Sequence, residues 1–142
     1  MRPNSIVWFE RLFLGSVVLG VANMFLHYAV LRDYSISRGG SPLGPIFGII
    51  LVMIISLPIW FFIARRASNV AKWITVVLTV LGLFSMFGSY PKAAAISPTY
   101  GFLSVVVSLL QAAAVAFLFR KDAVVWLKSK GRDASLDPSV FD

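Results

Sequence analysis

The chain has 142 residues, of which 58% are hydrophobic and only 13% charged, and its formal net charge is +7. Soluble domains contain about 45–50% apolar and about 25% charged residues, so a soluble chain of this length could not bury so much apolar surface. The composition therefore excludes an ordinary soluble domain and indicates an all-α polytopic membrane protein. Because the basic residues flank apolar runs, anionic lipid is a simpler partner for them than nucleic acid.

The side chains that could carry chemistry are few. There is no cysteine, which excludes disulfides, thiolate metal sites and cysteine nucleophiles, and one histidine, His27, cannot supply two ligands to haem or zinc. Four of the six acids lie in the last 21 residues: Asp122, Asp133, Asp137 and Asp142. We therefore expect no metal site, no cofactor and no enzymatic activity.

Four charge-free stretches are each long enough to span a hydrocarbon core, which needs roughly 20 apolar residues. They predict transmembrane helices at about 8–31, 42–64, 70–90 and 98–119, with loops at 32–41 and 91–97 and a turn at 65–72. Two Ser-Pro pairs, Ser41-Pro42 and Ser97-Pro98, predict the starts of the second and fourth helices. Pro58 predicts a kink in the second.

An even number of spans places both termini on the same side of the membrane. That side would carry ten Lys and Arg residues and the other side three, so the positive-inside rule predicts cytoplasmic termini. The interfacial aromatic residues also segregate by type. The four tryptophans fall at the cytoplasmic boundary (Trp8, Trp60, Trp73, Trp126), and the four tyrosines at the opposite one (Tyr28, Tyr34, Tyr90, Tyr100).

The chain is predicted to form one transmembrane domain, residues 1–130, followed by a short tail. Residues 120–130 should extend the fourth helix or lie at the headgroups as an interfacial helix. Residues 131–142 are polar and contain a proline, so we expect a disordered cytoplasmic tail.

Two segments resemble each other at a fixed offset of 62 residues. Residues 18–28 and 80–90 are identical at six of eleven positions, and the polar pairs Asn23/Ser85 and His27/Ser89 correspond. A tandem duplication of a two-span hairpin explains this pattern and implies a pseudo-two-fold axis along the membrane normal. The alternative is a chance similarity between two segments built from the same few apolar residue types.

Small residues recur at helical spacing in every predicted span, where they permit close helix contacts. The stripes are Ser16/Gly20, Gly44/Gly48, Thr75/Thr79/Gly82/Ser85/Ser89 and Ser104/Ser108/Ala112/Ala116. They predict a tight four-helix bundle. The same stripes could instead serve a homo-oligomer.

Asn23 and His27 are one turn apart and share a face of the first span. With Ser85 and Ser89 of the third span they form a candidate polar site facing outward, and Gln111 lies deeper. Polar groups at such depth usually face the interior of the helix bundle. The site could bind a ligand, a quinone headgroup or a proton. Alternatively, Asn23 or His27 simply donates a hydrogen bond to a serine of the third span.

A basic cluster marks the cytoplasmic side: Arg65, Arg66, Lys72, Arg120 and Lys121. It is chiefly a topology determinant, and each charge near an anionic leaflet contributes about 1 kcal/mol. Glu10 precedes the apolar run of the first span, so we expect it to pair with Arg65 or Arg66 at the headgroups.

Two stretches carry a family resemblance. They are Arg2-Pro3-x-Ser5-Ile6-x-x-Phe9-Glu10-Arg11-Leu12 and Ala64-Arg65-Arg66-x-Ser68-x-x-Ala71-Lys72-Trp73. The chain resembles small uncharacterised four-span proteins of bacterial inner membranes, which implies that location and no known activity.

The leading functional hypothesis is a non-catalytic accessory subunit or interaction module in the bilayer, with a membrane protein as partner. A small transporter or channel working as a homo-oligomer is the alternative. A protein that binds a quinone or another cofactor is the third.

Overall fold

The computed structural model describes residues 2–130, and the predicted tail lies outside them. This part of the chain forms six helices and no strand: α1 (Asn4–Leu26), α2 (Tyr28–Ser37), α3 (Gly44–Ala64), α4 (Asn69–Ile96), α5 (Pro98–Phe117) and α6 (Lys121–Lys128). Four of them, α1, α3, α4 and α5, are long and apolar enough to cross a membrane. The all-helical class and the number of candidate spans are as the sequence predicted.

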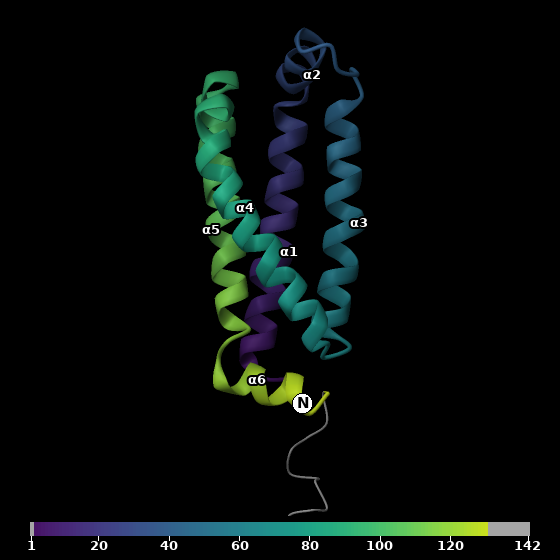
Figure 1. Ribbon diagram of the computed structural model, residues 1–142, viewed down its shortest axis with the longest axis vertical. Coiled ribbons are helices and arrows are strands. Elements are labelled where there is room, and N and C mark those ends of the chain that lie inside the picture. Colours follow the sequence, from purple (N-terminus) through teal and green to yellow (C-terminus); the bar gives the residue numbers. More distant parts are fainter. Residues whose placement is uncertain (1, 131–142) are drawn as a thin grey trace, which may run out of the picture.

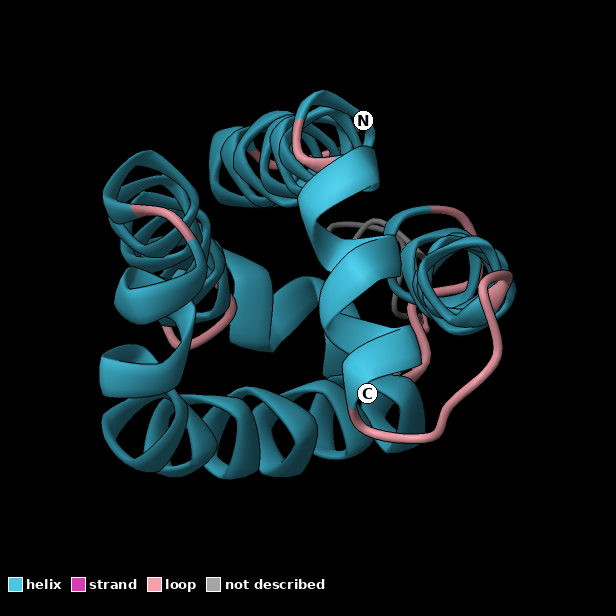
Figure 2. Cartoon of the chain, turned by 90° about the horizontal axis from the view of Figure 1, so that it is seen from above, coloured by secondary structure: helices cyan, strands magenta, loops and turns pink. Residues whose placement is uncertain are grey.

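Figure 1 shows α1 lying between α5 and α3, with α4 crossing diagonally from the foot of α3 to the top of α5. The short helix α2 lies at one end of the molecule. The N-terminus and α6 lie at the other end, where α6 is roughly perpendicular to the long helices. We refer to these as the α2 end and the α6 end. Figure 2, seen from above, shows the strong inclination of one long helix relative to the other three.

The proline-based predictions of helix starts were right for the fourth span and two residues early for the second. α5 begins at Pro98, and the Ser97 hydroxyl accepts a hydrogen bond from the Tyr100 amide at 3.5 Å. α3 begins at Gly44 instead of Pro42, because the Ser41 hydroxyl accepts from the Leu43 amide at 3.2 Å and closes a turn first.

The two predicted outer loops are largely helical, which corrects the sequence analysis. The first helix breaks at His27, and the chain resumes as α2 through to Ser37, where local hydrogen bonds such as Ser35 Oγ to the Ser41 carbonyl at 2.8 Å hold the turn. α4 continues through Pro91 to Ile96. A proline removes one backbone donor from a helix, and packing of this segment against α5 outweighs that loss.

The turn between α3 and α4 is short. Ala67 has a φ of 47° and is 3% exposed, a left-handed conformation that an alanine adopts only under tertiary constraint. Ser68 then caps α4 by accepting from the Ala71 amide at 3.2 Å. The turn therefore comprises residues 65–68, four fewer than the predicted 65–72, because α4 begins at Asn69.

The main apolar core lies at the α6 end. Phe9 and Phe13 of α1 are almost fully buried and stack with ring centroids 5.3 Å apart. They belong to a cluster that also includes Ile6, Ile63, Ala114, Leu118, Trp126 and Leu127. α6 is therefore packed onto the ends of α1 and α5, and residues 120–130 do not simply extend the fourth span.

The helix contacts are asymmetric. α1 packs along α5 over much of its length and α4 also packs along α5, whereas α3 and α4 approach each other only sparsely. An exact duplication of two hairpins would give α1–α5 and α3–α4 equivalent contacts, so the internal repeat stays a prediction. Only four residues of α3 are buried, Pro45, Ile49, Ile63 and Ala64.

Gly101 lets α4 and α5 approach closely near the α2 end. A Cβ added at Gly101 would lie 3.1 Å from both the Cα and the backbone nitrogen of Ala94, which cannot move aside independently. We expect Gly101→Ala to lower the free energy of unfolding in a detergent titration by about 1–2 kcal/mol, because overpacking exceeds the gain in helix propensity.

Gly88→Ala is the matched control for Gly101→Ala, since a Cβ there meets nothing within 4 Å. It should be neutral or slightly stabilising. Equal effects of the two substitutions would contradict a close α4–α5 contact at Gly101.

Candidate functional site: an intramembrane cavity and a basic edge

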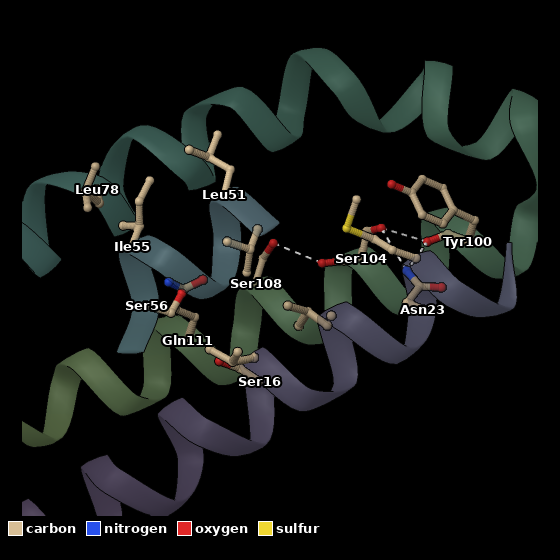
Figure 3. Close-up of a pocket in the computed structure, with 15 residues that line it drawn as sticks. Ser16, Asn23, Leu51, Ile55, Ser56, Leu78, Tyr100, Ser104, Ser108 and Gln111 are labelled. Carbon is tan, nitrogen blue, oxygen red and sulfur yellow. Dashed lines mark hydrogen bonds between the residues drawn. The ribbon is translucent and has the colours of Figure 1, made fainter. Parts of the chain in front are cut away.

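A cavity of about 430 Å³ lies between α1, α3 and α5, and Leu78 of α4 also lines it. Figure 3 shows its lining side chains. The polar members are Ser16, Asn23, Ser56, Tyr100, Ser104, Ser108 and Gln111, and the others are glycine or apolar.

Asn23 is the most buried polar side chain of the cavity after Ser16, with 3% of its surface exposed. Its amide nitrogen donates to the Tyr100 carbonyl and the Ser104 hydroxyl, both at 3.3 Å. Ser104 donates in turn to the same Tyr100 carbonyl at 2.8 Å. Asn23 therefore holds α1 to α5, and its side-chain oxygen Oδ1 accepts no hydrogen bond from the described residues.

The deeper part of the cavity is also polar. Ser108 donates to the Ser104 carbonyl at 2.9 Å, while Gln111 of α5 and Ser56 of α3 line the cavity nearer the α6 end. The structure thus brings two predicted site residues, Asn23 and Gln111, into one cavity. The α5 serines were assigned by sequence only to helix packing, although their spacing of four already placed them on one face.

His27 lies at the break between α1 and α2, just outside this cavity. Its Nδ1 lies 3.0 Å from the Asn23 backbone carbonyl, and its ring meets the Tyr100 ring edge-on at 5.5 Å. His27 is also the C-cap residue of α1, with φ −105° and ψ 16°. The two ring contacts involve local backbone and α5, not a serine of the third span.

Ser85 and Ser89 do not join Asn23 as the sequence suggested. Both are exposed on α4 and line a groove of about 260 Å³ between α4 and α5, which shares Tyr100, Ser104 and Ser108 with the cavity. Ser89 donates to the Ser85 carbonyl of its own helix at 2.6 Å. The reason is that Asn23 faces α5, which packs against both α1 and α4.

The cavity is suited to binding rather than to proton or ion chemistry. Its lining side chains are uncharged, and most of its accessible lining is apolar. Within residues 2–130, no three His, Cys, Asp or Glu side chains are close enough together to hold a metal ion. The arrangement supplies a few hydrogen-bonding groups in an apolar pocket, which is typical of sites for small organic molecules.

At the α6 end, Glu10 is the centre of a small ionic cluster. Its carboxylate pairs with Arg2 at 2.8 Å and with Arg65 at 3.5 Å, and 17% of the side chain is exposed. The predicted pairing with Arg65 is confirmed, and Arg2 joins it. Arg65 also lies 5.7 Å from the Trp60 ring centroid.

Lys72 is the most buried cation of the basic cluster, with 6% of its surface exposed. Its ammonium lies 4.3 Å from the Phe119 ring centroid and 5.7 Å from that of Trp73. The ion pairs within residues 2–130 join Glu10 to Arg2 and Arg65, and Asp33 to Arg32, so Lys72 has no acidic partner in that part of the chain. Arg66, Arg120 and Lys121 are exposed around it.

Asp122 of α6 caps the start of α1, an interaction that the sequence analysis missed. Its carboxylate accepts from the Ser5 hydroxyl at 2.7 Å and the Ser5 amide at 3.2 Å. The residue at the cap position of α1 is Pro3, whose side chain makes no cap hydrogen bond. The Ser5 hydroxyl bond in particular holds the pKa of the Asp122 carboxyl below its ordinary value. No local motif signals a cap supplied from 117 residues away.

Comparisons with protein-family models, with curated proteins and with solved structures found no match.

The Asp122 cap makes the docking of α6 pH-dependent. Because the folded-state pKa is lowered, the stabilisation is fully present above the ordinary carboxyl pKa of about 4 and is lost as the pH falls through the lowered value. Asp122→Asn should therefore reduce the free energy of unfolding by roughly 1 kcal/mol at neutral pH, the usual contribution of a cap. The difference from wild type should vanish in acid, as measured by detergent titration across pH.

Asp33→Asn is the control for the acid series, since Asp33 pairs only with the adjacent, exposed Arg32 at 2.9 Å and such pairs contribute little. A difference for Asp122→Asn that stays constant with pH would show that the charge is not what caps α1.

Proposed function

We propose that this chain is a non-catalytic integral membrane protein that acts as an interaction module or accessory subunit in the bilayer. In this proposal it is a four-span bundle of a bacterial inner membrane with both termini in the cytoplasm. The four apolar helices and the ten-to-three split of basic residues between the two ends of the spans support it.

The proposal rests on the part of the small-residue stripe of α4 that is exposed on the surface of the molecule. Thr75 and Thr79 of this face are buried in the molecule, whereas Gly82, Ser85 and Ser89 are exposed. A Cβ at Gly82 would meet nothing within 4 Å. The exposed residues line the groove between α4 and α5, which is concave and about 260 Å³ in volume.

Such a groove fits a transmembrane helix of another membrane protein. In lipid, helices associate through close packing at small residues and through interhelical hydrogen bonds, because apolar surface alone has no preference for protein over lipid. Ser85 and Ser89 offer both features. A partner helix with small residues at matching positions would cover them.

The intramembrane cavity favours a second candidate, a small transporter or channel that works as a homo-oligomer. Its polar line from Asn23 to Gln111 runs along much of α5. In that case the partner at the α4 groove would be a second copy of this chain. A role in quinone or other cofactor binding has no further support.

We propose that the basic cluster around Lys72 contacts anionic lipid headgroups. At the α6 end, cationic side chains lie over aromatic rings: Lys72 over Phe119, Arg65 over Trp60 and Arg11 over Trp8. This arrangement complements the topology role of the cluster.

Ser85→Phe tests the α4 groove, because a bulky ring there would keep a partner helix from close approach. Native mass spectrometry of the chain extracted gently from its own membrane should show a second protein with wild type and at least a fivefold loss with Ser85→Phe, roughly 1 kcal/mol. Val80→Phe is the matched control, since Val80 is also exposed but lies on the opposite side of α4. Photo-crosslinking from position 85, but not 80, should trap the same species.

The outcomes separate the candidates. A different protein lost only with Ser85→Phe supports the accessory role, and a homo-oligomer with the same behaviour supports the alternative. A monomer alone, or a complex indifferent to Ser85→Phe, would contradict the proposed groove.

Arg66→Gln tests the lipid contact, because Arg66 is an exposed member of the basic cluster, whereas Lys72 is only 6% exposed. In nanodiscs the Arg66→Gln variant should retain about fivefold less phosphatidylglycerol than wild type, since one charge near an anionic leaflet contributes about 1 kcal/mol. Phosphatidylcholine retention should not change. Lys92→Gln, at the α2 end, is the control, and equal losses for the two variants would contradict a defined headgroup contact at the basic cluster.

A further inference from the structure

We propose that the cavity between α1, α3 and α5 binds an uncharged amide, which forms hydrogen bonds with the Gln111 carboxamide of α5 and the Ser56 hydroxyl of α3. This inference rests on the membrane-spanning bundle of the proposed function and goes beyond it, because it needs neither a partner helix nor a lipid headgroup. Gln111 and Ser56 line the cavity and not the groove between α4 and α5.

The two side chains lie at matching depths of their helices. Ser56 precedes Arg65 by nine residues, and Gln111 precedes Arg120 by nine residues. At a rise of about 1.5 Å per residue, both are about 13 Å from the basic α6 end, close to the middle of a hydrocarbon core about 30 Å thick. Bulk water does not reach polar groups at that depth, so each of them needs a partner from the protein, from ordered water or from a ligand.

Both side chains are unpaired, and both can be reached from the cavity. The other serines of the lining donate to carbonyls of their own helices, whereas Gln111 and Ser56 make no hydrogen bond within residues 2–130. They are partly exposed, and their polar atoms are not among the buried, unpaired side-chain atoms of that part of the chain. In Figure 3 the Gln111 side chain extends from α5 toward the part of α3 that carries Ser56.

The chemistry of this pair decides the polar group of the ligand. A carboxamide presents a carbonyl acceptor beside an NH₂ donor, and a serine hydroxyl can serve as either. The complementary group therefore carries a donor and an acceptor side by side, as an amide does. No lining residue is charged, so an ion at this depth would lack a counter-ion and would be costly to bury.

The remaining lining decides the rest of the ligand. Apolar side chains from three helices surround the polar groups, including Val17, Leu51, Ile55 and Val107. The volume of about 430 Å³ lies within the usual range of sites for small organic molecules, roughly 300–1,000 Å³. The ligand is thus a small amide with an apolar body.

Three probes with the same eight-carbon chain test the proposal on the purified full chain in nanodiscs. Octanamide carries a donor and an acceptor, N,N-dimethyloctanamide carries the acceptor alone, and octane-1-sulfonate carries a permanent charge. Gln111 is the only glutamine of the chain, so glutamine-selective ¹⁵N labelling gives a single side-chain amide pair by NMR. Octanamide should shift this pair saturably, and the other two probes should bind at least about tenfold more weakly, the loss of one hydrogen bond.

Four variants locate the site by the binding of radiolabelled octanamide, with empty nanodiscs as the blank. Gln111→Leu should weaken binding about tenfold, and Ser56→Phe should abolish it by filling the cavity from α3. Leu57→Phe, adjacent in sequence, 41% exposed and outside the lining, should bind like wild type. Ser85→Phe, in the α4 groove, should also bind like wild type, which separates this site from the proposed partner surface. Ser56→Phe and its control keep the test valid even if Gln111→Leu fails to fold.

Each contrary result overturns the inference. Equal binding of N,N-dimethyloctanamide would show that no donor is recognised, and equal binding of octane-1-sulfonate would show that charge is tolerated. Binding without a shift at Gln111, or binding that survives Ser56→Phe, would place the amide elsewhere. No saturable binding of any probe would leave Gln111 to ordered water.

Discussion

The packing of α1 along α5 is the contact on which the rest of the structure depends. At the α6 end it buries Phe9 and Phe13 in the main core and brings Asp122 to the start of α1. Toward the α2 end it is held by the Asn23 amide on Tyr100 and Ser104. Apolar burial alone gives little preference between protein and lipid inside a bilayer, so these polar bonds set the register of the two helices.

The asymmetry of the other contacts follows from this pair. α5 is also the helix against which α4 packs, so α4 leans toward it and away from α3. α3, the most apolar span, is then left with few buried residues. One consequence is the cavity open between α1, α3 and α5, and another is the exposed half of the α4 small-residue face. Both proposed binding surfaces thus come from one uneven distribution of helix contacts.

Several features could be predicted from sequence because they depend on local chemistry. Charge-free runs of sufficient length identify the four apolar helices, and the Ser97-Pro98 pair identifies the start of α5. The Glu10–Arg65 pair was predictable because both flank spans on one side. The prediction of loops at 32–41 and 91–97 was wrong. Most of these residues are helical, because neighbouring helices and local hydrogen bonds stabilise a helix despite their turn-like composition.

By itself, the sequence determined the all-helical class, the four candidate membrane spans and their uncharged, sparsely reactive character, because hydropathy and residue inventory act residue by residue. Only the tertiary structure decided which polar residues meet. It placed Asn23 with Ser104 and Gln111 instead of with Ser85 and Ser89, and it brought Asp122 to Ser5. A helix has several faces of similar composition, and the choice among them depends on how whole helices pack.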